Sequence, residues 1–284
     1  MIRLEETEIR EAVRRALAED VGTGDVTTLA CVPPEATARA VLRARESMVL
    51  AGLAFARLAF HELDPNLKLQ TRAEDGQRLA PGDVALEISG AARAILTAER
   101  VALNFTQRLS GVATLTARFV AAVAGTKARI LDTRKTTPGW RRFEKYAVAC
   151  GGGTNHRTGL YDLVLIKDNH LAALAGASPN PIAAAVQRAR QAWPQLKVEV
   201  EADTLEQVDQ AAEAGADFIL LDNMPPDQLR EAVRQVRGRA QTEASGGIRL
   251  ETLRAVAETG VDFISVGAIT HSAPAVDLGL DFLP

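Results

Sequence analysis

The spacing of hydrophobic residues in the first third of the chain predicts strands and helices in mixed order. Apolar and polar residues alternate in three stretches, which is typical of half-buried strands, and two other stretches carry apolar residues at helical intervals. The strands are expected at residues 37–48, 67–70 and 84–88, and the helices at residues 7–19 and 52–63. Together these segments predict an α/β layer, an open sheet with helices packed on it.

A long helix-forming segment, residues 91–124, follows these strands. Ser110-Gly111 lies near its middle, and a glycine at such a position predicts a break in the helix. We therefore predict a domain boundary at this pair, with an N-terminal domain at residues 1–110.

Short apolar runs alternate with helical segments in the rest of the chain. The apolar runs begin at Ile130, Leu163, Val198, Phe218 and Phe263, and a more polar run covers Gln241 to Ala244. The helical segments between them have recognisable ends, such as the capping-box residues of Thr204-Leu205-Glu206-Gln207. The last strands follow one another at intervals of roughly 22 residues, and this regular alternation predicts a parallel sheet.

Charged residues or glycines follow nearly every one of these strands. A doubly wound open sheet would also alternate in this way, but functional residues at so many strand ends favour a barrel. Six strands are recognisable, so the fold class expected for residues 111–272 is an incomplete parallel α/β barrel with fewer than eight strands. The C-terminal segment, residues 273–284, is expected to leave the barrel and to pack back on the first domain.

Composition and charge exclude several classes of protein. The 284 residues are 47% hydrophobic and 24% charged, which allows a sizeable core. The net charge of −3 and an aromatic content of 4% give no support for a nucleic-acid partner. No apolar run is long enough for a membrane span, and the two cysteines, Cys31 and Cys150, cannot form a disulfide framework. We expect a cytoplasmic protein without a membrane partner.

The residues that follow the strands predict an anion-binding site. The cations are Arg134, Lys135, His156, Arg157 and Lys167; the acids are Glu201 and Asp222; the glycines are Gly246, Gly247 and Gly267, with Ser245 beside the pair. Each residue alone has an ordinary structural explanation. Gathering so many cations at one end of the barrel, however, destabilises the fold by several kcal/mol through repulsion and desolvation unless anions neutralise them. Glycines between a strand and a helix suit phosphate, and paired carboxylates suit Mg²⁺ beside a phosphate. The sequence therefore predicts a phosphorylated, metal-bound substrate next to a second anionic group.

Several motifs in this region resemble those of a known family. Asp132-Thr133-Arg134-Lys135-Thr136-Thr137-Pro138-Gly139, Asn155-His156-Arg157 and Lys167-Asp168-Asn169-His170 look like quinolinate phosphoribosyltransferase, also called carboxylating nicotinate-nucleotide pyrophosphorylase. Glu99-Arg100, Val198-Glu199-Val200-Glu201, Leu221-Asp222-Asn223 and Ala244-Ser245-Gly246-Gly247 extend the resemblance. The motifs occur in order from near residue 19 to residues 267–272, so the resemblance covers almost the whole chain.

This resemblance implies a reaction and a set of roles. Quinolinate and phosphoribosyl pyrophosphate would give nicotinate mononucleotide, pyrophosphate and CO₂ in NAD biosynthesis, with Mg²⁺ as cofactor. It also implies an α/β-sandwich N-terminal domain and a homodimer with shared active sites. The substrate-binding residues would be Arg100 (from the neighbouring subunit), Thr133, Arg134, Lys135, His156, Arg157, Lys167, Glu201, Asp222, Ser245, Gly246, Gly247, Gly267 and His271. Lys135, Glu201 and Asp222 would be catalytic, and Glu201 and Asp222 would hold Mg²⁺ or the ribose hydroxyls.

Two alternative functions are compatible with the same residues. One is a paralogous phosphoribosyltransferase of the same fold that uses another acceptor; direct transfer to nicotinate is less favoured because a monocarboxylate does not require so many cations. The other is a non-catalytic sensor that binds a phosphate or nucleotide. The presence of Glu201 and Asp222 argues against a sensor, since binding of anions alone does not call for acids among the cations.

Overall fold

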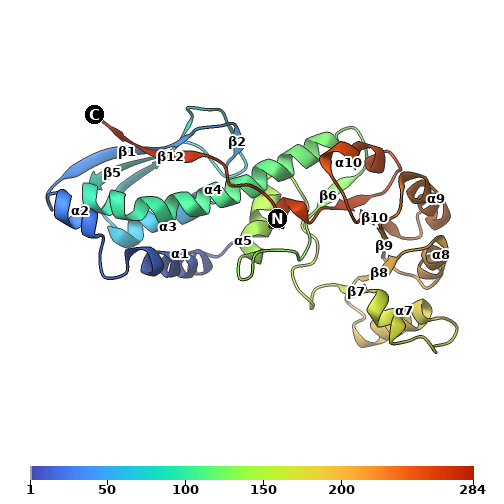
Figure 1. Ribbon diagram of the computed structural model, residues 1–284. Helices are drawn as coiled ribbons and strands as arrows, with labels where there is room; N and C mark the ends of the chain where they lie inside the picture. Colours follow the sequence, from blue (N-terminus) through green and yellow to red (C-terminus); the bar gives the residue numbers. More distant parts are fainter. Residues whose placement is uncertain (1) are drawn as a thin grey trace. The chain divides into compact units, whose positions relative to one another are not determined.

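Residues 2–284 are described in the computed structural model, and the chain forms two compact units (Figure 1). The first unit consists of Met1–Ala117, Thr137–Gly152 and Ile269–Pro284, and the second of Arg118–Thr136 and Gly153–Ala268. None of the helices within residues 2–284 combines the length and the hydrophobicity that spanning a bilayer requires.

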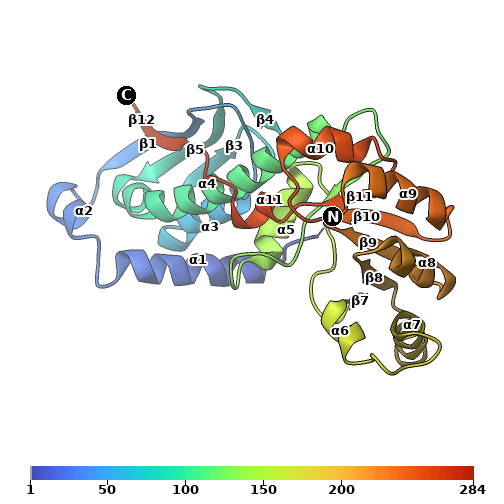
Figure 2. The ribbon, with the colours of Figure 1, turned by 45° about the vertical axis from the view of Figure 1, so that its right-hand side comes forward.

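The first unit contains an antiparallel sheet with helices on one side. Its strands are β1 (Thr37–Ala44), β3 (Lys68–Thr71), β5 (Val84–Ala91) and β12 (Leu278–Leu283), in the order β12-β1-β5-β3; β2 (Met48–Val49) pairs separately with β4 (Arg78–Leu79). The helices are α1 (Glu6–Val21), α2 (Val26–Cys31), α3 (Leu53–Leu63), α4 (Ala92–Ala122), α5 (Arg141–Cys150) and α11 (Ala268–His271). Helices α3 and α4 lie along the sheet (Figures 1 and 2), and the fully buried Leu42, Leu86, Ile88, Phe55 and Ile95 form the core there.

The predicted helix break at Ser110-Gly111 is wrong, because α4 continues through this pair to Ala122. The small residues serve close packing instead. A Cβ on Gly111 would come within 2.0 Å of the carbonyl oxygen of Pro274, so only glycine lets the C-terminal segment cross the helix there. The hydroxyl of Ser110 donates to the carbonyl of Ala51 and accepts from its N–H.

The second unit is a parallel sheet surrounded by helices, which confirms the predicted incomplete barrel. Its six strands are β6 (Arg129–Leu131), β7 (Val164–Ile166), β8 (Val198–Ala202), β9 (Phe218–Asp222), β10 (Gln241–Ser245) and β11 (Phe263–Ser265), in the order β6-β11-β10-β9-β8-β7. Helices α6 (Asp168–Ala172), α7 (Pro181–Ala192), α8 (Leu205–Glu213), α9 (Pro226–Val236) and α10 (Leu250–Ala257) connect them. The capping box of α8 is present, with Thr204 accepting from the N–H of Gln207. Strands β6 and β7 form the two edges of the sheet, so the barrel stays open between them.

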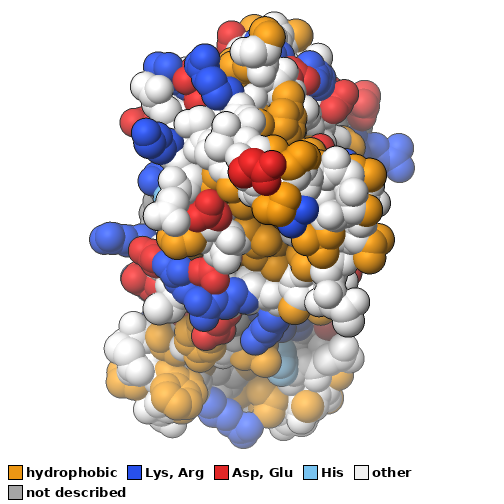
Figure 3. Space-filling model, turned by 90° about the vertical axis from the view of Figure 1, so that its left-hand side faces the viewer, with side chains coloured by type: hydrophobic (Ala, Val, Ile, Leu, Met, Phe, Trp, Pro, Cys, Tyr) orange, Lys and Arg blue, Asp and Glu red, His pale blue; other side chains and the backbone are white. Residues whose placement is uncertain are grey.

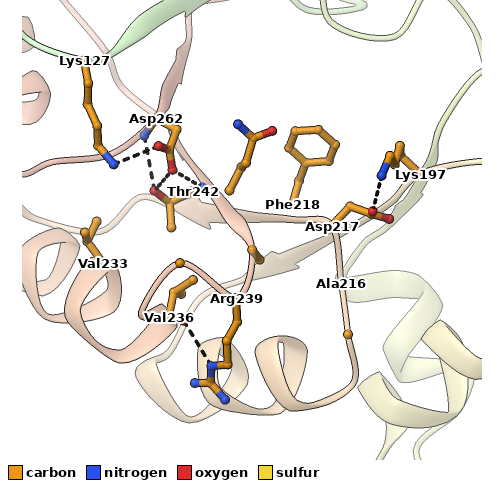
Figure 4. Close-up of a pocket in the computed structure, with 14 residues that line it drawn as sticks. Lys127, Lys197, Ala216, Asp217, Phe218, Val233, Val236, Arg239, Thr242 and Asp262 are labelled. Carbon is orange, nitrogen blue, oxygen red and sulfur yellow. Dashed lines mark hydrogen bonds and ion pairs between the residues drawn. The ribbon is translucent and has the colours of Figure 1, made fainter.

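Two aspartates fix the amino ends of the strands, around a cavity of about 490 Å³ (Figure 4). Asp262 accepts from the N–H of Thr242 at 2.8 Å and pairs with Lys127 at 2.8 Å. Asp217 accepts in the same way from the N–H of Val198 and pairs with Lys197. Burial alone would raise the pKa of both carboxyls, but these hydrogen bonds and cations hold each pKa below its usual value. These charged groups therefore connect the starts of neighbouring strands at this end of the barrel.

Candidate active site

The strand register decides which side chains point into the barrel. Glu199 lies beside Leu165 and Phe218, and Glu243 lies beside Leu220 and Phe263. Side chains two residues further along each strand face the same way, because alternate residues of a strand share a face. This puts Lys167, Glu201, Asp222 and Ser245 at the carboxyl ends of neighbouring strands β7, β8, β9 and β10, a group that we call the carboxyl edge.

The second unit also brings the other predicted barrel residues to the ends of its strands. Thr133, Arg134 and Lys135 follow β6, His156 and Arg157 lie in the segment after Thr154, which bridges to Leu131 at the end of β6, and Gly267 follows β11. Gly246 and Gly247 come directly after β10. Arg100 and His271 belong to the first unit, where Arg100 is exposed on α4 and His271 ends α11.

Acids and a lysine contact one another at the carboxyl edge. The ammonium of Lys167 forms an ion pair with Glu201, whose side chain is only 11% exposed. Burial first, and then the charge of Glu201, raise the pKa of Asp222 above its usual value. Glu201 and Asp222 are therefore close enough to repel each other, which favours a cation between or beside them.

Two neighbouring arginines, Arg134 and Arg157, leave positive charge without a complete set of partners among the described residues. The Nε of Arg134 is buried and has no hydrogen-bond partner among the described residues. Burial and the charge of Arg134 lower the pKa of Arg157, so the two guanidinium groups are near each other. A buried guanidinium nitrogen without an acceptor costs free energy that a bound carboxylate would recover.

The glycine pair after β10 is a close-packed turn next to Asp222. Gly246 and Gly247 have φ of 93° and 60°, which side chains other than glycine rarely adopt. A Cβ on Gly246 would come within 2.1 Å of the Asn223 side-chain oxygen. Asn223 in turn donates from Nδ2 to Asp222 at 2.5 Å. The turn thus exposes backbone beside the acids, as a phosphate-binding turn requires.

Three buried acids that the sequence analysis did not select hold the segment that contains His156. Asp132 is fully buried and accepts from the N–H of His156 and from Nδ2 of Asn155, each at 2.8 Å. Nε2 of His156 lies 3.0 Å from Oε2 of Glu199 and 3.4 Å from Oε2 of Glu243. Burial and the neighbouring Glu243 raise the pKa of Glu199. Glu199 lies two residues before Glu201 on the same strand, so its side chain faces the same way, and the sequence alone could have indicated its place in the site. Glu243 lies in a polar run, and nothing in the sequence indicates its contact with His156.

Comparison with known proteins gives a consistent result along the whole chain. The family described as quinolinate phosphoribosyl transferase matches through its N-terminal domain at residues 25–110 and through its C-terminal domain at residues 112–281. A curated relative from Mycobacterium leprae, nicotinate-nucleotide pyrophosphorylase (carboxylating), is 46% identical over 96% of this chain and 96% of its own. A probable nicotinate-nucleotide pyrophosphorylase (carboxylating) from Bacillus subtilis is 43% identical over 96% of this chain and 93% of its own.

Solved structures agree with the sequence comparisons. The nicotinate-nucleotide pyrophosphorylase from Francisella tularensis superimposes with a TM-score of 0.93 at 41% identity, over 99% of this chain and 98% of its own. A human nicotinic acid phosphoribosyltransferase shares only the fold, with 17% identity and a TM-score of 0.60 over 91% of this chain and 72% of its own.

Proposed function

Because this chain belongs to the quinolinate phosphoribosyltransferase family, we propose that its barrel transfers the phosphoribosyl group of phosphoribosyl pyrophosphate to quinolinate. The products are nicotinate mononucleotide, pyrophosphate and CO₂, and the reaction belongs to NAD biosynthesis. The observation that carries this proposal is the cluster of cations and acids at the strand ends, in which the buried Nε of Arg134 has no hydrogen-bond partner among residues 2–284.

The acceptor fits the cationic side of this cluster. Quinolinate is a dicarboxylate, and Arg134, Arg157 and Lys167 offer charged donors for two carboxylates, with His156 beside them. In the structure Lys167 is paired with Glu201, so an arriving carboxylate competes with that acid for the ammonium.

The donor fits the residues that follow β6, β10 and β11. The backbone of Ser245, Gly246, Gly247 and Gly267 would hold the 5′-phosphate, as glycine turns after late barrel strands do. Thr133 and Lys135 would contact the pyrophosphate end; the hydroxyl of Thr133 accepts from the N–H of Lys135, which orders this turn.

Mg²⁺ suits the acidic part of the carboxyl edge. Glu201 and Asp222 offer carboxylate oxygens from adjacent strands, and Mg²⁺ prefers one or two such ligands together with substrate phosphates. When bound, the ion would neutralise charge on the pyrophosphate. Its removal by a chelator should abolish turnover and its return should restore it.

The protein's own part in the reaction is binding and electrostatic stabilisation. The pyridine nitrogen attacks the ribose carbon while pyrophosphate leaves, and positive charge develops on the sugar. Glu201 and Asp222 would stabilise that charge electrostatically, and Lys135 would stabilise the leaving pyrophosphate. The ribosylated ring nitrogen then accepts the electron pair that remains when the adjacent carboxylate departs as CO₂.

We also propose a homodimer in the cytoplasm, with an active site shared between the two copies. Arg100 is an exposed cation on α4, and the first unit leaves Val26 and Leu29 exposed at 76% and 54%. Figure 3 views the end of the first unit that carries α2 and shows hydrophobic side chains gathered among charged ones, a composition that favours an interface. Free Cys31 and Cys150 are compatible with a reducing compartment.

Mixing of two inactive variants tests both the shared site and the dimer. Arg100→Ala and Glu201→Gln are expected to be inactive alone, and a mixture that exchanges subunits should recover up to about a quarter of the wild-type rate, because one site in a mixed dimer is intact. No recovery from a mixture that sedimentation shows to be dimeric and exchanged would contradict the shared site.

A further inference from the structure

Glu199 and Glu243 form a buried acid pair in the barrel interior, below the carboxyl edge. Their side chains are 1% and 2% exposed, and both lie against His156, whose side chain is 12% exposed. They line a cavity of about 230 Å³ together with Phe218, Phe263 and Arg129. The proposed reaction assigns no step to either acid.

Burying these two acids lowers the stability of the folded protein, and the fold does not require acids at these positions. Both carboxylate oxygens of Glu199 and Oε1 of Glu243 are buried without a hydrogen-bond partner among the described residues, although Oε2 of Glu199 lies within ion-pair distance of His156. Buried carboxylates destabilise a protein by several kcal/mol unless they are paired, and apolar residues of similar size at these positions would fill a barrel interior well. The two acids are therefore better explained by a role in function than by a role in stabilising the fold.

The hydrogen bonds of His156 indicate what the acids do. Its Nδ1 accepts from the N–H of Arg157 at 2.7 Å, so in the neutral ring Nδ1 carries a lone pair and Nε2 carries the proton. Nε2 lies 3.0 Å from Oε2 of Glu199 and 3.4 Å from Oε2 of Glu243, within ion-pair distance of both acids. A protonated Nε2 has no lone pair for a metal ion, which argues against a His-Glu-Glu metal site.

The same contacts link the acid pair to the acceptor-binding cation. The ring of His156 is held from inside the barrel by the acids, and its other nitrogen holds the backbone of Arg157. Asp132 holds the backbone of His156 from the opposite side. We propose that Glu199 and Glu243 are positioning residues, which fix His156 and through it place Arg157 for the carboxylates of the acceptor. This inference rests on the proposed function of the same site.

Substitution of Glu243 separates positioning from simple stability. Glu243→Leu fills the space but removes the acceptor, and it should raise the KM for quinolinate about tenfold or more while the KM for phosphoribosyl pyrophosphate stays within twofold. Glu243→Gln keeps a carbonyl oxygen for the Nε2–H and should keep the quinolinate KM within about threefold. Phe263→Leu is the matched control: it changes the same cavity without touching His156, and it should lower Tm with neither KM changed.

Three results would overturn the positioning role. They are an unchanged quinolinate KM in Glu243→Leu, an equal rise of both KM values, and a stoichiometric metal that Glu243→Leu loses. If wild-type protein does not turn over quinolinate at all, the proposed function fails first, so the two failures are distinguishable.

A spectroscopic measurement keeps the inference testable even if a variant does not fold. The chain has four histidines, and ¹⁵N shifts of the ring nitrogens in wild-type protein, assigned with His156→Gln, report which nitrogen carries the proton. Burial alone would lower the pKa of His156, but the two acids raise it to about 10. We therefore expect a protonated Nε2 at neutral pH, and an Nδ1 without a proton once the ring becomes neutral at higher pH. The reverse tautomer would contradict the proposed contact with the acid pair.

Discussion

Replacement of Arg134 by alanine tests the acceptor site most sharply. The guanidinium is half-buried, its Nε has no partner among the described residues, and its charge reaches Arg157. Removing one partner of a buried charge-assisted pair costs roughly 2–5 kcal/mol, because the substrate carboxylate is then left unpaired. At about 1.4 kcal/mol for each factor of ten, kcat/KM for quinolinate should fall roughly 30- to 5,000-fold.

The assay is initial-rate kinetics with each substrate varied in turn. Arg134→Lys should lie between wild type and Arg134→Ala, since a lysine keeps the charge but loses the two-pronged geometry. Arg239→Ala is the control, because Arg239 lies at the amino ends of the strands and should leave kcat/KM unchanged. A near-normal kcat/KM for quinolinate in Arg134→Ala, with the protein folded, would refute the assignment of Arg134.

Two further predictions concern stability. Asp262→Asn should lower the free energy of unfolding by about 1–2 kcal/mol at pH 7, because a backbone N–H and Lys127 lose a charged partner. Because the pKa of Asp262 is lowered in the folded protein, the stability difference between wild type and variant should be complete above the usual aspartate pKa and should vanish as the pH falls through the lowered value. Denaturant unfolding from pH 7 to pH 2 measures this difference. A difference in the free energy of unfolding that persists at pH 2 would contradict the prediction. Gly111→Ala should destabilise by about 1–3 kcal/mol or more in thermal unfolding, because its Cβ would overlap the Pro274 carbonyl, and an unchanged Tm would show that the C-terminal segment can shift without cost.

The strands and helices of the barrel could be predicted because periodicity and helix ends agree there. The five apolar runs and the more polar run at Gln241 correspond to the six strands, and the capping box at Thr204 caps α8. The helix break predicted at Ser110-Gly111 was wrong because the sequence cannot distinguish a glycine that lets another segment cross a helix closely from a glycine that ends the helix. Only the contact with Pro274, which lies far along the chain, distinguishes the two.

The site could be predicted in its residues but not in its internal contacts. Strand ends place Lys167, Glu201 and Asp222 together, and this follows from the parallel order of the strands. The contacts of His156 with Glu199 and Glu243 depend on how far a loop folds into the open side of the barrel. No spacing rule gives that depth, so the acids beneath the site emerge only from the three-dimensional structure.

The measurement that tests the central claim most directly is product analysis of the purified protein with quinolinate, phosphoribosyl pyrophosphate and Mg²⁺, with nicotinate in a parallel reaction. Mass spectrometry of the nucleotide and capture of released CO₂ identify the acceptor and the reaction together. The account predicts nicotinate mononucleotide and an equal amount of CO₂ from quinolinate, and no product from nicotinate. Turnover of nicotinate alone, or no turnover of quinolinate by folded protein that binds phosphoribosyl pyrophosphate, would contradict it.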